Sequence, residues 1–114
     1  MARISYGSIY RQLLTFDDGK GSKERPVFVL DSDADDVYFF AISTKKGKEH
    51  QRKYRPAFLG WRQSGLTEPS YILIDDPPYI LKKSLFTKDK YIGEASDFDI
   101  NTLESHISDL GLDK

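Results

Sequence analysis

Arg25 is the residue of this sequence best placed to bind an anion. It stands directly before Pro26 and a β-branched run, in the stretch "DDGKGSKERPVFVL". A proline favours an extended backbone at the residue before it, so a buried strand should anchor Arg25 while its guanidinium faces the loop. A guanidinium anchored in this way can bind a phosphate through two parallel hydrogen bonds. The pattern therefore indicates a phosphate-binding residue.

Two hydroxyl residues, Ser43 and Thr44, close the next apolar run, "VYFFAIST". In an antiparallel pair the start of one strand lies beside the end of the next, so both hydroxyls are expected to converge with Arg25 on one phosphate. A simpler alternative stays open. Arg25 then pairs only with a nearby carboxylate, and the two hydroxyls only terminate a strand. The carboxylates concerned are Asp17, Asp18 and Asp31.

The charge distribution is uneven along the chain. The net charge of the 114 residues is −1, which does not suggest a general nucleic-acid binder. Residues 1–65, however, hold twelve Lys/Arg against eight Asp/Glu, whereas residues 66–114 hold five against ten. The most basic stretch is "KKGKEHQRKYR", Lys45–Arg55, and such a patch attracts phosphates even on a neutral protein. The alternative is a loop that is merely solvated.

The sequence lacks the residues that several other chemistries require. The chain has no cysteine, which excludes disulfides, thiolate catalysis and zinc sites built on sulfur. The two histidines, His50 and His106, form no metal-binding motif, so neither a metal nor another cofactor is expected. The "GKGS" loop lacks the spacing of a Walker motif. Without a signal peptide or an apolar run that could span a bilayer, a cytoplasmic protein with no membrane partner is expected.

The elements that must position these residues are short strands. Length and composition fit one soluble domain over residues 1–114. Apolar and β-branched runs between turn residues predict six strands. They are Ser8–Phe16, Pro26–Asp31, Val37–Thr44, Pro56–Trp61, Ser70–Asp75 and Tyr79–Phe86. This pattern predicts a mainly β fold, either a small barrel or a strongly coiled sheet.

A helix is predicted near the C-terminal end. Four apolar residues recur there at helical spacing: Ile100, Leu103, Ile107 and Leu110. Asp99 is expected to be the N-cap and Gly111 to end the helix. The apolar stripe should pack on the barrel.

A series of short motifs follows one order along nearly the whole chain. These are "GSIY", Gly21–Pro26, Ser43–Thr44, Ser70–Asp75, Gly93 and Asp97–Leu110. Together they resemble the MazF/PemK family of toxin endoribonucleases. That family opens with such a strand and passes through a Gly-Ser loop into an Arg-Pro strand. It ends its third strand on a Thr/Ser pair and closes with a glycine and a helix.

The resemblance implies an SH3-like barrel of the MazF/CcdB type with a C-terminal helix, and a homodimer. It implies a toxin that cleaves single-stranded RNA without a metal, through attack of a ribose 2′-hydroxyl on the adjacent phosphate. A cognate antitoxin protein is the implied partner, and DNA is contacted only through that antitoxin. Because the substrate supplies the nucleophile, the protein must hold the phosphate, stabilise its charge and move protons. Arg25 is expected to stabilise the charge, with Ser43 and Thr44 assisting.

Proton transfer has two expected candidates, Asp75 and Glu24. Some family members carry a basic residue two positions before the aspartate that matches Asp75; here that position is Leu73, which leaves a purely structural role open. Glu24 stands beside Arg25, and its alternative is an ion pair with a neighbour. Six loop residues are assigned to RNA binding at flanking phosphates: Lys20, Gly21, Ser22, Lys23, Lys45 and Lys46.

Two other functions remain open. The first is a CcdB-like toxin of the same barrel type, which binds gyrase and catalyses nothing. The second is a catalytically silent SH3-like interaction module, for which an aromatic content of 13% would supply a binding surface. The Arg-Pro strand start and the Ser-Thr pair favour the nuclease.

Overall fold

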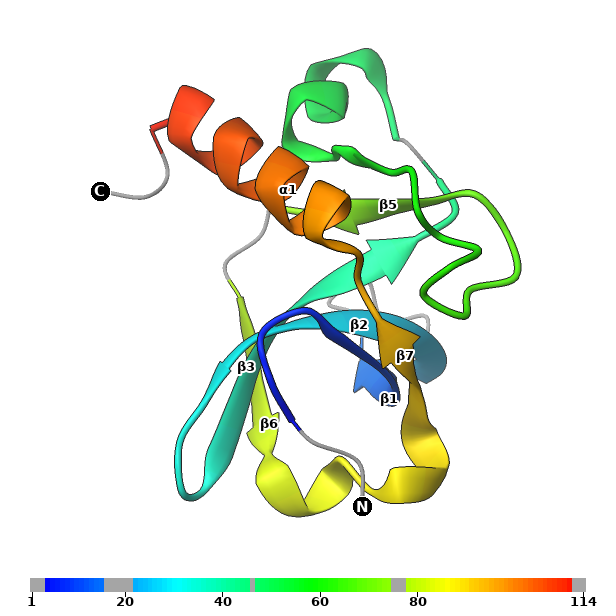
Figure 1. The fold of residues 1–114 in the computed structure, drawn as a ribbon, viewed down its shortest axis with the longest axis vertical. Coiled ribbons are helices and arrows are strands. Elements are labelled where there is room, and N and C mark those ends of the chain that lie inside the picture. Colours follow the sequence, from blue (N-terminus) through cyan, green and yellow to red (C-terminus); the bar gives the residue numbers. More distant parts are fainter. Residues whose placement is uncertain (1–3, 16–21, 46, 75–77, 112–114) are drawn as a thin grey trace.

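A computed structural model describes residues 4–15, 22–45, 47–74 and 78–111, and it is mainly β with one C-terminal helix (Figure 1). The strands are β1 (Ser8–Thr15), β2 (Ser22–Ser32), β3 (Asp36–Ser43), β4 (Ala57–Phe58), β5 (Ser70–Leu73), β6 (Tyr79–Lys82) and β7 (Tyr91–Glu94). The helix α1 spans Asp97–Asp109, and short 3-10 helices cover Glu49–Tyr54, Lys83–Leu85 and Lys88–Lys90. No helix in the described part of the chain is both long and apolar enough to cross a bilayer.

The strands form one antiparallel sheet in the order β4-β5-β3-β2-β1-β7. β3 pairs with β2 along one edge and with two strands along the other. Its first half, Asp36–Phe39, pairs with β6, and its second half, Ala41–Ser43, pairs with β5. Because one strand edge serves two partners that diverge, the sheet curls strongly (Figure 1). The expected coiled sheet is confirmed at this level.

Each face of the sheet carries its own core. Phe28 and Phe40 are paired across β2 and β3 and point to the face covered by α1, where Leu103 packs against them. Their neighbours Val27 and Ala41 point to the opposite face. That second core is closed by Phe86 and by residues of β6 and β7. β2 and β3 are therefore buried on both faces, which explains their continuous apolar runs.

The N-cap of α1 lies three residues before the expected one, Asp99. Ser96 is the N-cap, and its hydroxyl accepts a hydrogen bond from the Asp99 N–H at 3.2 Å. The prediction that Asp99 caps the helix was wrong. Asp99 is buried, and its carboxylate accepts the Gly60 N–H at 3.0 Å and the Ser96 hydroxyl at 2.8 Å. Gly111, with φ of 72°, ends the helix region as predicted.

Other boundaries also differ from expectation. β7 was not predicted, because "YIGE" is short and carries a glycine. Its pairing with β1 places Ile9 opposite Gly93. The predicted strand Pro56–Trp61 is reduced to two residues, since the chain turns at Gly60 to meet Asp99. The basic segment contains the 3-10 helix Glu49–Tyr54, and the backbone carbonyl of its Lys53 contacts the His106 ring on α1.

Candidate active site

A small pocket lies where β2 and β3 separate. Their paired register ends at Val27 and Ala41, while β2 continues back to Ser22 alongside β1. The separation leaves a pocket of about 190 Å³, which we call the Arg25 pocket. It is lined by Lys23, Glu24, Arg25, Pro26, Ile42, Ser43, Thr44 and Ser70. The expected convergence of Arg25 with Ser43 and Thr44 is present in this pocket.

Arg25 is held over Ser43. The side chain is half-buried, and its Nη1 donates to the Ser43 Oγ at 3.5 Å. Pairing of Arg25 with Gln12 of β1 fixes its backbone. The same Ser43 oxygen accepts the Lys45 N–H at 3.1 Å, so the hydroxyl joins the end of β3 to the guanidinium. Asp31, one of the carboxylates in the alternative interpretation, lies at the far end of β2, where it accepts the Ser32 N–H.

Thr44 and Ser70 complete the pocket wall beside Ser43. Thr44 is exposed just beyond the end of β3. Ser70 begins β5 and is buried, and its hydroxyl donates to the Glu68 carbonyl at 2.8 Å. The pairing of Ser43 with Tyr71 brings Ser70 to this position. Ser70 was part of the motif Ser70–Asp75 but was not predicted as a site residue, because only the β3–β5 pairing places it in the pocket.

Glu24 is oriented differently from Arg25. Successive side chains of a strand point to opposite faces. The Glu24 carboxylate forms ion pairs with Arg11, at 3.8 Å, and with Lys90, at 3.5 Å. This arrangement agrees with the alternative interpretation, in which Glu24 pairs with neighbours. Glu24 lines the Arg25 pocket, and its carboxylate is engaged with Arg11 and Lys90.

The remaining predicted site residues divide into two groups. Lys23 and Lys45 are exposed at the rim of the Arg25 pocket or next to it, as an electrostatic role requires. Lys20, Gly21, Lys46 and Asp75 lie outside the described residues, and Ser22 is described only through its backbone in β2. Their assigned roles stay predictions.

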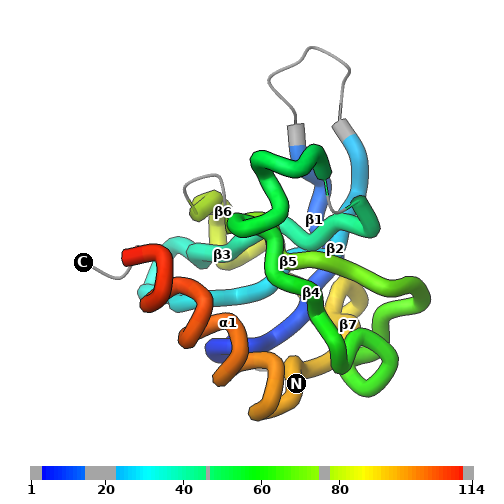
Figure 2. The backbone as a smooth tube through the Cα atoms, turned by 90° about the horizontal axis from the view of Figure 1, so that it is seen from above, coloured from blue at the N-terminus to red at the C-terminus, as the bar shows by residue number. Residues whose placement is uncertain are grey.

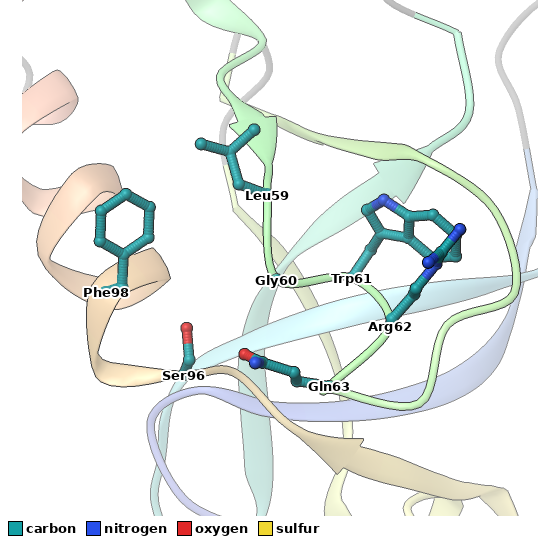
Figure 3. Close-up of a pocket in the computed structure, with 7 residues that line it drawn as sticks. All are labelled: Leu59, Gly60, Trp61, Arg62, Gln63, Ser96 and Phe98. Carbon is teal, nitrogen blue, oxygen red and sulfur yellow. The ribbon is translucent and has the colours of Figure 1, made fainter.

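A second hollow, wider and more open, lies beside the first turn of α1. We call it the Trp61 groove; its volume is about 580 Å³. It is lined by Leu59, Gly60, Trp61, Arg62, Gln63, Ser96 and Phe98 (Figure 3). Sequence reasoning did not select these residues. The available signal was the stretch "LGWRQSG", a single tryptophan next to an arginine inside a turn.

The Arg25 pocket and the Trp61 groove are formed by different elements of the fold. β2 enters the sheet beside β1, whereas β4 and the turn after it run toward the first turn of α1 (Figure 2). The two hollows share no lining residue.

The chain matches no protein-family model, and a search of curated proteins finds no match.

Proposed function

We propose that the protein is an endoribonuclease toxin of the MazF/PemK type, which cleaves single-stranded RNA at the Arg25 pocket. One observation carries the proposal: an arginine and two hydroxyl residues that are distant in sequence meet in one pocket at a strand separation. A guanidinium with adjacent hydroxyls suits the non-bridging oxygens of a phosphodiester. The motif order described above supports the same assignment.

In the proposed reaction the ribose 2′-hydroxyl attacks the adjacent phosphorus. A bond forms between the 2′-oxygen and phosphorus, and the bond from phosphorus to the 5′-oxygen of the next nucleotide breaks. The products are a 2′,3′-cyclic phosphate and a free 5′-hydroxyl. The proton lost by the 2′-hydroxyl balances the proton gained by the leaving oxygen, so neither a metal nor another cofactor is needed for the balance.

Arg25 stabilises the charge that builds on the phosphate oxygens. The guanidinium is anchored before the reaction begins, through β1 and through the Ser43 hydroxyl, so little reorganisation is needed. Thr44, exposed on the same wall, donates to a second oxygen. Glu24 can act as the base only after it leaves Arg11 and Lys90, which makes Asp75 the more attractive candidate for proton transfer.

The proposed partners follow from the same assignment. A toxin of this type forms a homodimer and is neutralised by an antitoxin protein whose acidic segment competes with RNA for the basic loops. Lys23 and Lys45 are exposed and available to either ligand. A cytoplasmic location belongs to the proposal as well, since the substrate is messenger RNA.

Incubation of the purified protein with end-labelled RNA in EDTA tests the proposal. We expect cuts in single-stranded RNA, termini that carry a 2′,3′-cyclic phosphate, and little cleavage of a duplex of the same sequence. A strict requirement for added magnesium would overturn the metal-independent mechanism. Binding to gyrase without any RNA cleavage would favour the CcdB-like alternative.

A further inference from the structure

The Trp61 groove has a wall of stacked planar groups. The Arg62 guanidinium lies over the Trp61 indole, with 4.9 Å between its Cζ and the ring centroid. Trp61 is half-buried and packs against the core beneath α1, so the indole is fixed. Arg62 is exposed and extends the stack toward solvent. A rigid indole capped by a guanidinium presents a flat, positively charged surface.

Two large apolar side chains stand exposed around the same groove. Leu59 is 63% exposed and Phe98 is 61% exposed. Phe98 lies on the helix side, while Leu59 and the Trp61–Arg62 stack lie on the loop side (Figure 3). Apolar groups on both sides of an open groove favour a flat apolar ligand that enters between them.

The loop that carries Trp61 is held firmly by backbone hydrogen bonds. The Trp61 carbonyl accepts the Leu66 N–H at 2.9 Å and the Ser64 hydroxyl at 3.0 Å. The Gly60 N–H is bound to the buried Asp99 carboxylate at 3.0 Å. Gly93 also lies so close that a Cβ there would come within 2.1 Å of the Ser64 carbonyl oxygen. The groove is therefore formed before any ligand arrives, which reduces the entropic cost of binding.

The groove lining carries one formal charge. Arg62 is cationic, and the six other lining residues, Leu59, Gly60, Trp61, Gln63, Ser96 and Phe98, have neutral side chains. The lining thus favours a ligand that combines a planar apolar ring with negative charge. A nucleotide has both features, and unpaired bases commonly stack on aromatic rings and on arginine planes. The Gln63 amide, exposed at the edge, can hydrogen-bond to the base.

From these features we propose that the Trp61 groove is a nucleobase-binding subsite for single-stranded RNA. An unpaired base stacks on the outer face of the Arg62 guanidinium, which covers Trp61, with Leu59 and Phe98 beside it. The charge of Arg62 attracts the attached phosphate. This inference rests on the proposed function, because it assigns the groove to the strand that is cut at the Arg25 pocket. The groove would select among RNA sequences, and the Arg25 pocket would cut them.

Trp61 reports directly on this proposal, because it is the only tryptophan of the chain. Its fluorescence is followed during titration with a single-stranded oligonucleotide whose 2′-hydroxyls are methylated, so that no cleavage occurs. We expect saturable quenching as a base stacks on the Arg62 guanidinium that covers the indole. An abasic strand of equal length carries the same phosphates, and it should bind without quenching. Equal quenching by the abasic strand would overturn the proposal.

Variants at Leu59 and Phe98, which are exposed, test the groove without disturbing the core. Leu59→Ser and Phe98→Ser should each weaken binding of the methylated strand, measured by fluorescence anisotropy of a labelled end. Loss of the stack in Trp61→Leu should weaken it further, by roughly tenfold or more. Ile80→Ser is the matched control, since Ile80 is 58% exposed on β6, outside the groove. Unchanged affinity in both Leu59→Ser and Phe98→Ser would contradict the proposal.

The two proposals fail in different ways. If RNA is bound and cut without any change in Trp61 fluorescence, the groove assignment is wrong and the nuclease stands. If the methylated strand quenches Trp61 but no RNA is cut, the groove assignment holds and the nuclease is wrong. Quenching only by peptides, with none by RNA, would assign the groove to a protein ligand and overturn the nucleobase subsite.

Discussion

The Arg25 pocket and the Trp61 groove are built in opposite ways. Side chains make the pocket: two strands separate, and the gap is bounded by a guanidinium and hydroxyls. Main-chain contacts position the groove: the Gly60 N–H binds the Asp99 carboxylate on the first turn of α1, and the Ser64 carbonyl lies close against Gly93 of β7. The pocket is small and lined by charged and hydroxyl side chains, whereas the groove is about three times larger and lined by large side chains such as Leu59, Trp61 and Phe98.

Taken together, the two proposals divide chemistry from recognition between the Arg25 pocket and the Trp61 groove. Stabilisation of a developing charge needs a few donors fixed within a narrow space. Recognition of a base needs area and planar surfaces, which a turn rich in large side chains provides. Point substitutions in the Arg25 pocket should therefore change the rate of RNA cleavage. Backbone changes near the Trp61 groove should change the shape of the surface that binds the base. Four predictions test this division.

The largest effect is expected from Arg25→Ala. Loss of a preorganised donor should lower the cleavage rate at saturating RNA by roughly a hundredfold to a thousandfold. Arg25→Lys should recover little of it, because an ammonium lacks the fork geometry. Lys82→Ala is the matched control: it removes an exposed charge of the same sign on β6, outside the Arg25 pocket, and should leave the rate close to normal. Circular dichroism checks that the variants fold, and an unfolded Arg25→Ala would make Arg25 structural.

Gly93→Ala should disrupt the Trp61 groove. The new Cβ would meet the Ser64 carbonyl at 2.1 Å, so the turn must move, at a cost of about 1–3 kcal/mol in the free energy of unfolding. Trp61 fluorescence of the folded variant should change as well. Gly111→Ala is the control, since open space surrounds that glycine. Its positive φ makes the variant less stable by about 1–2 kcal/mol, without altering Trp61. Urea-induced unfolding measures the loss in the free energy of unfolding for both variants.

A smaller effect is expected from Lys45→Ala. Lys45 is exposed beside the Arg25 pocket, so it should contact a flanking phosphate by charge. Loss of one such contact should reduce the salt slope of single-stranded binding by roughly 0.7. Lys88→Ala, on the 3-10 helix before β7, should leave that slope unchanged. An unaltered slope in Lys45→Ala would mean that the basic segment is merely solvated.

The smallest effect is expected for the titration of Tyr91, which lies on β7 two residues before Gly93. Burial, with the hydrogen bond from Tyr91 to the Glu94 carboxylate at 2.8 Å, raises the pKa of Tyr91 to about 12. Its contribution to stability should be complete below pH about 10, the usual pKa of tyrosine, and should disappear as the pH rises through 12. Glu94→Gln should lower the pKa of Tyr91, as followed by tyrosinate absorbance.

A matched pair of residues checks that assignment. Tyr6 donates to Glu104 at 3.1 Å, and burial together with this bond raises the pKa of Tyr6 to about 12 as well. Glu104→Gln should therefore affect the titration of Tyr6 and leave that of Tyr91 alone. If neither substitution lowers a late titration, the carboxylates contribute little and burial alone accounts for both shifts.

The Arg25 pocket was largely predictable from sequence, and the groove was not. Arg-Pro before a β-branched run and Ser-Thr after one are local patterns, and antiparallel pairing alone brings them together. The groove depends on Asp99, which has the residue type of an N-cap but serves as an acceptor for the distant Gly60. Ser96, one turn earlier, provides the cap. No local pattern distinguishes these roles, because the deciding contact spans two remote segments.

The pairing of β1 with the distant strand β7 has a consequence for the order in which the protein folds. β1, β2 and β3 are joined by consecutive pairings and can associate early as local hairpins. Closure of the sheet must wait for β7, which places Glu94 opposite Ser8. Contacts between such distant residues slow folding, typically into the range of milliseconds to seconds. During synthesis the strands that carry Arg25 and Ser43 can therefore pair before the support of the Trp61 groove exists.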